Sequence, residues 1–260
     1  MTLMELIVAV AVLAILLLGF SVVFSQSHRV VSTAQSAMRA NAKAAAITSV
    51  LRRDIKRASQ QGFLYLGYDD DGRPRLIITA AGPTPSVTGP VRGNGAVVCL
   101  GARPKADAAD EEFILWRAGY VLSPSGDDPD IFRLGGNNVT QGDIQAAARP
   151  QMQAWCTSLC SGSYNDQLTV PPTNLSQLGE VWQVLSAWCT ELEIAWTDGS
   201  VVGTALQWQT TSELWTHHDQ NDWPMAIRFR FRLVDPTLPE EMRGAGEDEY
   251  RYEVICPVGR

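Results

Sequence analysis

The start of this 260-residue sequence has no basic residue in front of its longest apolar run. The run, residues 6–24, is interrupted only by Gly19 and Ser21, and Glu5 is the one charge that precedes it. A secretory signal peptide carries Lys or Arg ahead of its apolar region and a small-residue cleavage site behind it, so this run does not match one. As a helix it spans about 28 Å, close to the roughly 30 Å hydrocarbon core of a bilayer. The run therefore predicts a helix that crosses a membrane.

Glycine and proline are also missing from a long stretch of the N-terminal region. No Gly lies between Gly19 and Gly62, and the first Pro is Pro74. This lack of helix breakers predicts one helix of roughly 90 Å, with residues 1–27 as the membrane and assembly segment and 28–61 as an amphipathic continuation. Small and apolar residues recur in it at steps of three and four, as on a buried helix face. They are Ala44, Ile47, Leu51, Ile55 and Ala58.

Glu5, at the border of the apolar run, has two ordinary explanations. Thr2 and Glu5 fit a capping box, in which the carboxylate reaches back to free amides at the start of a helix. Alternatively, the run is a plain signal anchor and Glu5 is incidental. In that case the nearest basic residues all follow the span. This placement conflicts with the usual rule that basic residues flank a span on its cytoplasmic side. These residues are His28, Arg29, Arg39 and Lys43. We therefore expect that basic residues once preceded Met1.

The segment TLMELIVAVAVLAILLLG, residues 2–19, resembles the mature N-terminus of the bacterial type IV pilin superfamily. Pilins are made with a short basic leader, which a prepilin peptidase removes just before a residue that is then N-methylated, usually Phe and sometimes Met. The resemblance implies that Met1 is this residue, with the N-terminus facing the cytoplasm. It also implies that Glu5 pairs with the N-terminal ammonium of a neighbouring subunit. Met1 and Glu5 share one helix face, so such pairs would fix the axial register of assembly.

Two further segments resemble the minor pilins of the W type and the minor pseudopilins of the J type. They are SVLRRDIKRASQ, residues 49–60, like the end of the long helix, and DWPMAIRFRFRLVDP, residues 222–236, like a shared late strand. Alternation in the second segment predicts one buried and one wet strand face. The arginine row is either a solvated face or a contact with an acidic partner. The buried set is Ile227, Phe229, Phe231 and Leu233, and the arginine set is Arg228, Arg230 and Arg232.

Residues 62–260 are predicted to form a β-rich head with one core. Apolar runs between Gly- and Pro-rich loops predict seven strands, and residues 142–190 are predicted to be a partly helical insertion. The expected fold class is α+β: a pilin-like long N-terminal helix, membrane-spanning in its first half, packed on a C-terminal antiparallel β-sheet with a large loop and helical insertion. The predicted strands are 75–80, 96–101, 112–120, 191–197, 204–210, 225–234 and 249–258.

The charge of the chain is divided unevenly between stalk and head. Residues 1–58 contain seven Lys and Arg against two acidic residues, whereas residues 59–260 contain 14 against 26. A basic stalk joined to an acidic head suits staggered packing, in which a head meets a neighbour's stalk. An acidic head also argues against specific nucleic-acid binding, because phosphates attract clustered cations.

Five cysteines fit an oxidising compartment, where four can pair and one is left over. Cys99 and Cys256 lie in predicted strands, and we expect a disulfide between them. Cys156, Cys160 and Cys189 lie in the predicted insertion, where one further bridge is expected. A zinc site formed by these three and a histidine is an alternative, although structural zinc sites favour tighter, paired spacing.

No catalytic motif is evident in the sequence. His217, His218 and Asp219 form the one tempting cluster, but adjacent His side chains diverge on most backbones, so a polar loop is favoured over a metal or acid/base site. The segment 69–71 (Asp69, Asp70, Asp71) lies at an expected turn, where calcium is a candidate without a visible full ligand set. We expect a non-enzymatic protein without a cofactor. The eight tryptophans are expected mainly in the core, although some can form a sugar- or partner-binding surface.

The resemblance implies a minor pilin or minor pseudopilin, a non-catalytic subunit that helps initiate and cap a type IV pilus-like filament. Its expected partners are other minor subunits, the major pilin, prepilin peptidase, the inner-membrane assembly platform and, before assembly, the membrane itself. The expected location is the inner membrane with a periplasmic head, and later the filament tip. The alternatives are a shaft subunit, or a membrane-anchored binding or enzyme domain with a pilin-like export segment.

Overall fold

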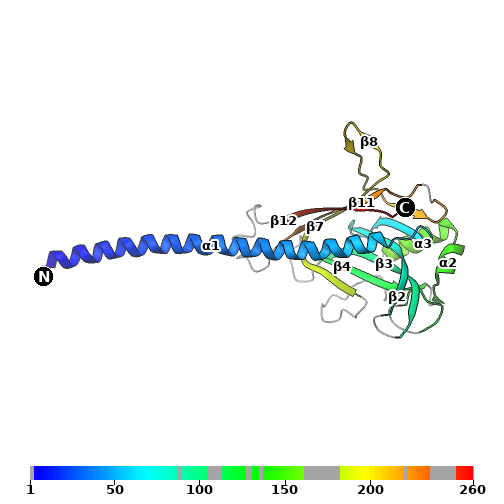
Figure 1. Cartoon of the computed structure of the whole chain (residues 1–260), viewed down its shortest axis with the longest axis horizontal. Coiled ribbons are helices and arrows are strands. Elements are labelled where there is room, and N and C mark those ends of the chain that lie inside the picture. The colour runs from blue at the N-terminus through cyan, green and yellow to red at the C-terminus, as the bar shows by residue number, and fades with distance from the viewer. Residues whose placement is uncertain are drawn as a thin grey trace.

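A single long helix leads into a β-rich head (Figure 1). The structure is a computed structural model. Helix α1 (Leu3–Lys56) has 54 residues, which corresponds to a length of about 80 Å. Figure 1 shows α1 as one rod whose N-terminal half projects away from the head. The described residues are 3–86, 90–104, 113–126, 131–134, 137–160, 182–219, 222–234 and 250–259.

The C-terminal half of α1 buries one narrow stripe of residues at steps of three and four. This confirms the predicted buried helix face for its first four members. The helix ends at Lys56, whereas the sequence predicted residue 61. It stops earlier because Ala58 bridges to Ala80 and the Ser59 amide donates to the Thr79 carbonyl at 2.8 Å, which draws the chain into the sheet. The stripe is Ser36, Ala40, Ala44, Ile47, Leu51 and Ile55.

Gly62, the first glycine after Gly19, is required for a close approach of the chain to the sheet. A Cβ atom at this position would lie 2.4 Å from the Cβ of Thr79, so a larger residue would push the chain off the sheet.

The head is built on an eight-stranded sheet in which every neighbouring pair is antiparallel. The sheet is strongly curved. Trp196 and Trp215 lie on strands that are far from each other in the strand order, yet their rings are only 4.9 Å apart. In spatial order the strands are β10 (Glu213–Thr216), β1 (Phe63–Tyr68), β2 (Pro74–Pro85), β3 (Arg92–Pro104), β4 (Phe113–Val121), β7 (Trp182–Thr197), β11 (Ala226–Leu233) and β12 (Tyr250–Pro257).

Smaller elements decorate this sheet. Helix α2 (Gln141–Ala146) begins with a capping box between Thr140 and Asp143, and α3 (Arg149–Cys160) follows it. Two short hairpins complete the described fold: β5 (Arg133–Leu134) with β6 (Asn137–Asn138), and β8 (Val201–Val202) with β9 (Ala205–Leu206).

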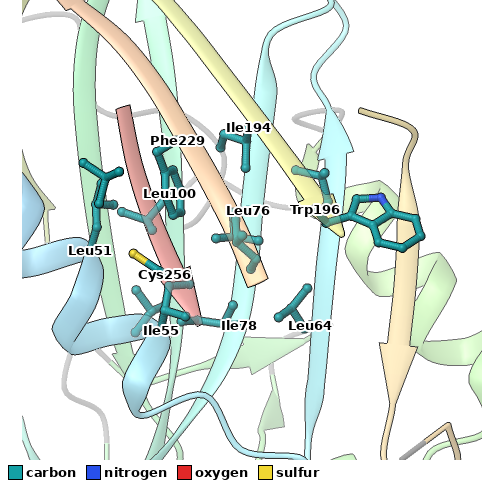
Figure 2. Close-up of a cluster of buried hydrophobic side chains, with 14 of the residues drawn as sticks. Leu51, Ile55, Leu64, Leu76, Ile78, Leu100, Ile194, Trp196, Phe229 and Cys256 are labelled. Atoms are coloured by element: carbon teal, nitrogen blue, oxygen red, sulfur yellow. The ribbon is translucent and has the colours of Figure 1, made fainter. Parts of the chain in front are cut away.

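Both faces of the sheet are covered, so the head has two apolar cores. One core lies between the sheet and α1, and it contains Leu51 and Ile55 of the helix together with Leu100 and Phe229 of the sheet (Figure 2). The other lies between the sheet and helices α2 and α3. Because successive strand residues point to opposite faces, a strand covered on both sides is apolar throughout, and β1 is buried at five of its six positions.

The predicted fold class is confirmed: the chain is α+β, with a long N-terminal apolar helix packed on a large antiparallel sheet in a pilin-like arrangement. The predicted insertion, residues 142–190, contains helices α2 and α3, and its residues 161–181 lie outside the described part of the chain. Its predicted end was wrong, because residues 182–190 belong to β7, which pairs with β4. Strands β1 and β10 were not predicted. The predicted strand 204–210 is reduced to Ala205–Leu206 within a small hairpin.

Candidate functional site

The N-terminal half of α1 is an apolar surface that the rest of the chain does not cover. Every described side chain from Leu3 to Val31 is exposed. Within the described residues, α1 is the one helix long and apolar enough to cross a membrane by length and composition, and none of its most apolar window is buried. So large an exposed apolar surface needs lipid or other apolar helices around it.

The two residues proposed to fix register cannot be placed in detail. Glu5 belongs to α1, but its side chain lies outside the described part of the structure, as do Met1 and Thr2. The capping box and the roles of Met1 and Glu5 therefore stay predictions.

A buried ion pair fixes the C-terminal end of α1 to the sheet. The Asp54 side chain is only 1 % exposed and faces Arg117 of β4, which is 16 % exposed. Arg117 donates through Nε to one carboxylate oxygen at 2.5 Å and through Nη2 to the other at 3.1 Å. Arg53 lies near the same carboxylate at 3.5 Å but is 56 % exposed. The two-point contact orients α1 as well as neutralising Asp54.

A second contact holds the middle of α1 to the last strand. The Tyr252 hydroxyl donates to Asn41 Oδ1 at 2.9 Å, and the Tyr250 hydroxyl lies 3.5 Å from Ser36 Oγ. Residue numbers rise together along both elements, so β12 runs in the same direction as α1. Burial, and then the nearby Tyr250, raise the pKa of Tyr252, which keeps its hydroxyl available as a donor.

The arginine row of β11 is paired within the head. Arg228 contacts Glu193 at 2.8 Å and Arg230 contacts Glu253 at 2.6 Å. Arg232 contacts Glu191 at 3.1 Å. The predicted alternation is confirmed, since the four intervening apolar residues are buried. The acidic neighbours are thus carboxylates of the adjacent strands β7 and β12, which accounts for the row without a partner protein.

The predicted Cys99–Cys256 disulfide is wrong, because all five cysteines are free and these two lie on opposite faces of the sheet. The predicted bridge within the insertion is absent too. Cys156 and Cys160 lie in α3 with Cys99 in one core, whereas Cys189 lies in β7 in the other. Burial raises the pKa of Cys99 and Cys160 to about 12, and that of Cys189 and Cys256 to about 11, so these thiols stay protonated.

The acidic turn proposed for calcium uses the carboxylates of Asp69 and Asp71 for other contacts, and Asp70 is exposed. Asp69 accepts hydrogen bonds from the amides of Asp71 and Arg73 and lies 3.4 Å from the guanidinium of Arg75. Asp71 contacts Arg73 at 2.6 Å. Among the described residues, no three His, Cys, Asp or Glu side chains gather as metal ligands, so neither this turn nor the alternative zinc site takes shape there.

The histidine pair does not diverge as expected, because the rings of His217 and His218 lie 3.9 Å apart. Burial, and then the charge of His218, lower the pKa of His217. Asp219 accepts hydrogen bonds from Thr216 and pairs with Arg149 at 2.7 Å. Burial acts to raise the pKa of Asp219, but these hydrogen bonds and Arg149 outweigh it, so its pKa lies below the usual value. The Asp219 carboxylate is therefore committed to Thr216 and Arg149.

Sequence reasoning missed a pocket of about 360 Å³ at the end of the head where α1 terminates. It gathers residues from α3, β7, β10 and the loop before β11. A signal was available, because each of the three tryptophans that line the pocket lies within two residues of a carboxylate in the sequence. The lining residues are Arg149, Trp196, Asp198, Glu213, Leu214, Trp215, Asp219, Asp222 and Trp223.

Comparison of the sequence with protein-family models matches no family, and comparison with curated proteins gives no match.

Proposed function

We propose that the chain is a minor pilin or minor pseudopilin, a non-catalytic subunit that helps initiate and cap a type IV pilus-like filament. The observation that carries this proposal is the division of α1 into two halves. The first half is apolar and exposed, and the second is fixed to the head by a buried stripe, the Asp54–Arg117 pair and β12. The exposed apolar surface of such a helix can lie first in lipid and later in a bundle of similar helices.

In the proposed mechanism, assembly transfers the N-terminal half of α1 from the bilayer to a helical bundle. Glu5 would then receive the N-terminal ammonium of a neighbouring subunit. An unpaired carboxylate among apolar helices is unfavourable, so only the axial register that supplies its partner is stable. The opposite charges of the basic stalk and the acidic head also favour staggered packing, in which the head of one subunit meets the stalk of its neighbour.

The proposal also specifies where the chain is located and which proteins it contacts. Prepilin peptidase would expose and methylate Met1 at the cytoplasmic side, leaving the head in the periplasm until the assembly platform extracts the chain. Its neighbours would be other minor subunits and the major pilin. A bulky head is harder to tile along a shaft, which favours the tip over a shaft position. We propose no cofactor, catalytic role or specific nucleic acid for the chain.

A crosslinking experiment in the native membrane tests the register. All five native cysteines are buried, so Ile7→Cys, at an exposed position near Glu5, introduces the one accessible thiol. After labelling of this thiol with a maleimide–benzophenone reagent, we expect light-induced crosslinks to other pilin-like chains, reduced at least tenfold when Glu5→Gln is added. Asp70→Cys, on an exposed turn of the head, is the matched control and should give no crosslinks that depend on Glu5.

The intact N-terminal mass of the native protein completes the test. An N-methylated Met1 together with these crosslinks supports a processed filament subunit. An unprocessed N-terminus without pilin-like neighbours would sink the proposal and leave an anchored domain whose role lies in the head.

A further inference from the structure

The pocket lined by residues of α3, β7, β10 and the loop before β11 combines aromatic rings with uncompensated negative charge. Trp196, Trp215 and Trp223 line it and are almost fully buried, so only parts of their rings reach the opening. The indole N–H groups of Trp196 and Trp223 donate to the carbonyls of Thr211 and Thr216. These two rings are therefore held in place and contribute aromatic carbon to the pocket.

The charges of the pocket do not cancel. Four carboxylates and one guanidinium line it, for a net charge of −3. Arg149 is fully engaged by Glu213 at 3.3 Å, Asp219 at 2.7 Å and the Leu214 carbonyl at 3.0 Å. Asp198 accepts a hydrogen bond from the Ser200 amide, and neither it nor Asp222 pairs with a cation among the described residues. Two carboxylates are thus left to attract a positive charge.

The head already uses this combination to hold arginines. Arg228 lies over the ring of Trp208 at 4.7 Å and pairs with Glu193 at 2.8 Å. Arg75 lies over Trp116 at 5.8 Å and contacts Asp69 at 3.4 Å. A planar guanidinium suits both contacts, because it stacks on an aromatic face while its N–H groups reach a carboxylate. In the pocket Arg149 occupies Glu213 and Asp219, whereas among the described residues no arginine pairs with Asp198 or Asp222.

An exposed apolar arm adjoins the pocket. The β8–β9 hairpin follows Asp198 and projects from the head, as Figure 1 shows for β8. Its Val201 and Val202 are 57 % and 67 % exposed, and Leu206 is exposed as well. Met225, also exposed, lies at the base of this hairpin, where its amide donates to the Thr197 carbonyl. Apolar side chains on an isolated two-stranded arm are typical of a contact surface.

We infer that this pocket binds an arginine side chain of a partner polypeptide, with apolar residues of the partner on the β8–β9 arm. Asp198 and Asp222 pair with the guanidinium and the tryptophan rings face its plane. The partner is a polypeptide because the arm beside the pocket offers side-chain-sized apolar contacts that a small cation does not use. The pocket belongs to the single chain, so the inference does not depend on filament assembly.

The test uses the full chain in detergent micelles and calorimetric titration with blocked peptides. The probe is acetyl-Val-Val-Arg-Val-amide, compared with the same peptide carrying citrulline, the neutral isostere of arginine. We expect the arginine peptide to bind at least tenfold more tightly than the citrulline peptide. Its affinity should fall when ionic strength rises from about 0.05 to about 0.5 M, because the pocket is open to solvent.

Two charge-removing variants and a control locate the binding. Asp222→Asn and Asp198→Asn should each weaken binding of the arginine peptide about fivefold. Asp70→Asn removes the same charge from an exposed turn elsewhere and should leave binding unchanged. Val202→Ser should weaken binding of this peptide more than that of acetyl-Gly-Gly-Arg-Gly-amide. Equal binding of the citrulline peptide, unchanged affinity in Asp222→Asn, or no binding of the arginine peptide at millimolar concentration would each overturn the inference.

Discussion

At the scale of single residues, Asp54 is a buried carboxylate whose charge depends on Arg117. Removing Arg117 leaves that charge uncompensated between α1 and the sheet, so Arg117→Met is expected to lower the free energy of unfolding by about 3 kcal/mol. Denaturant unfolding of the chain in micelles, followed by circular dichroism, measures the change. Adding Asp54→Leu should recover most of the loss, because the pair is then replaced by apolar contacts.

Arg53 provides the matched control, since it touches the same carboxylate from an exposed position. Arg53→Met should change the free energy of unfolding by less than about 0.5 kcal/mol, as solvent screens an exposed ion pair. Equal effects of the two arginine substitutions would contradict the assignment of the neutralising role to Arg117.

Single residues also show where sequence reasoning succeeds and where it stops. The alternation around Arg230 was predictable, because a two-residue period is a local property of a strand. The separation of Cys99 from Cys256 was not predictable, because the face of the sheet that a cysteine occupies depends on the register of each strand. The pocket was missed for a related reason: Trp196 and Trp215 meet through the curvature of the whole sheet.

At the scale of elements, α1 is attached to the head through its C-terminal part, from Ser36 to Lys56. Ile55 is fully buried between α1 and the sheet (Figure 2), so Ile55→Ala creates a cavity and should cost about 3 kcal/mol of unfolding free energy. Val30→Ala removes apolar atoms from the exposed half of the same helix. This substitution should change the free energy of unfolding by less than about 0.5 kcal/mol. Thermal and denaturant unfolding of both variants in micelles give the comparison. A loss of stability in Val30→Ala as large as that in Ile55→Ala would refute the division of α1 into a free half and an attached half.

Element boundaries were less predictable than element types. The long helix and six of the eight main strand regions follow from helix breakers and apolar runs, at least in part. Strand β7 was cut short, because its first half pairs with β4 through irregular register and lacks a clean alternation. The short edge strand β10 has only four residues, too few for a period to show.

At the scale of the whole molecule, the head is expected to fold without the apolar span. The stripe of buried α1 residues begins at Ser36, so deleting residues 1–27 removes only side chains that are exposed where the structure describes them. The shortened chain should keep the stability of the full chain and no longer need detergent. Deleting residues 1–44 also removes Asn41 and Ala44 and should lower the free energy of unfolding by about 2 kcal/mol. Unfolding curves and partition into detergent micelles distinguish these outcomes, and aggregation of the first deletion in the absence of detergent would contradict the expectation.

The parallel course of α1 and β12 has a mechanical consequence. A pull along the axis of α1, applied through its N-terminal half, acts along the seam with β12 and not across it. The Ser36–Tyr250, Asn41–Tyr252 and Asp54–Arg117 contacts are spread along this direction, so tension loads them together in shear instead of opening them one after another as a zipper. A head carried on such a rod is expected to stay attached when its stalk is pulled along the helix axis.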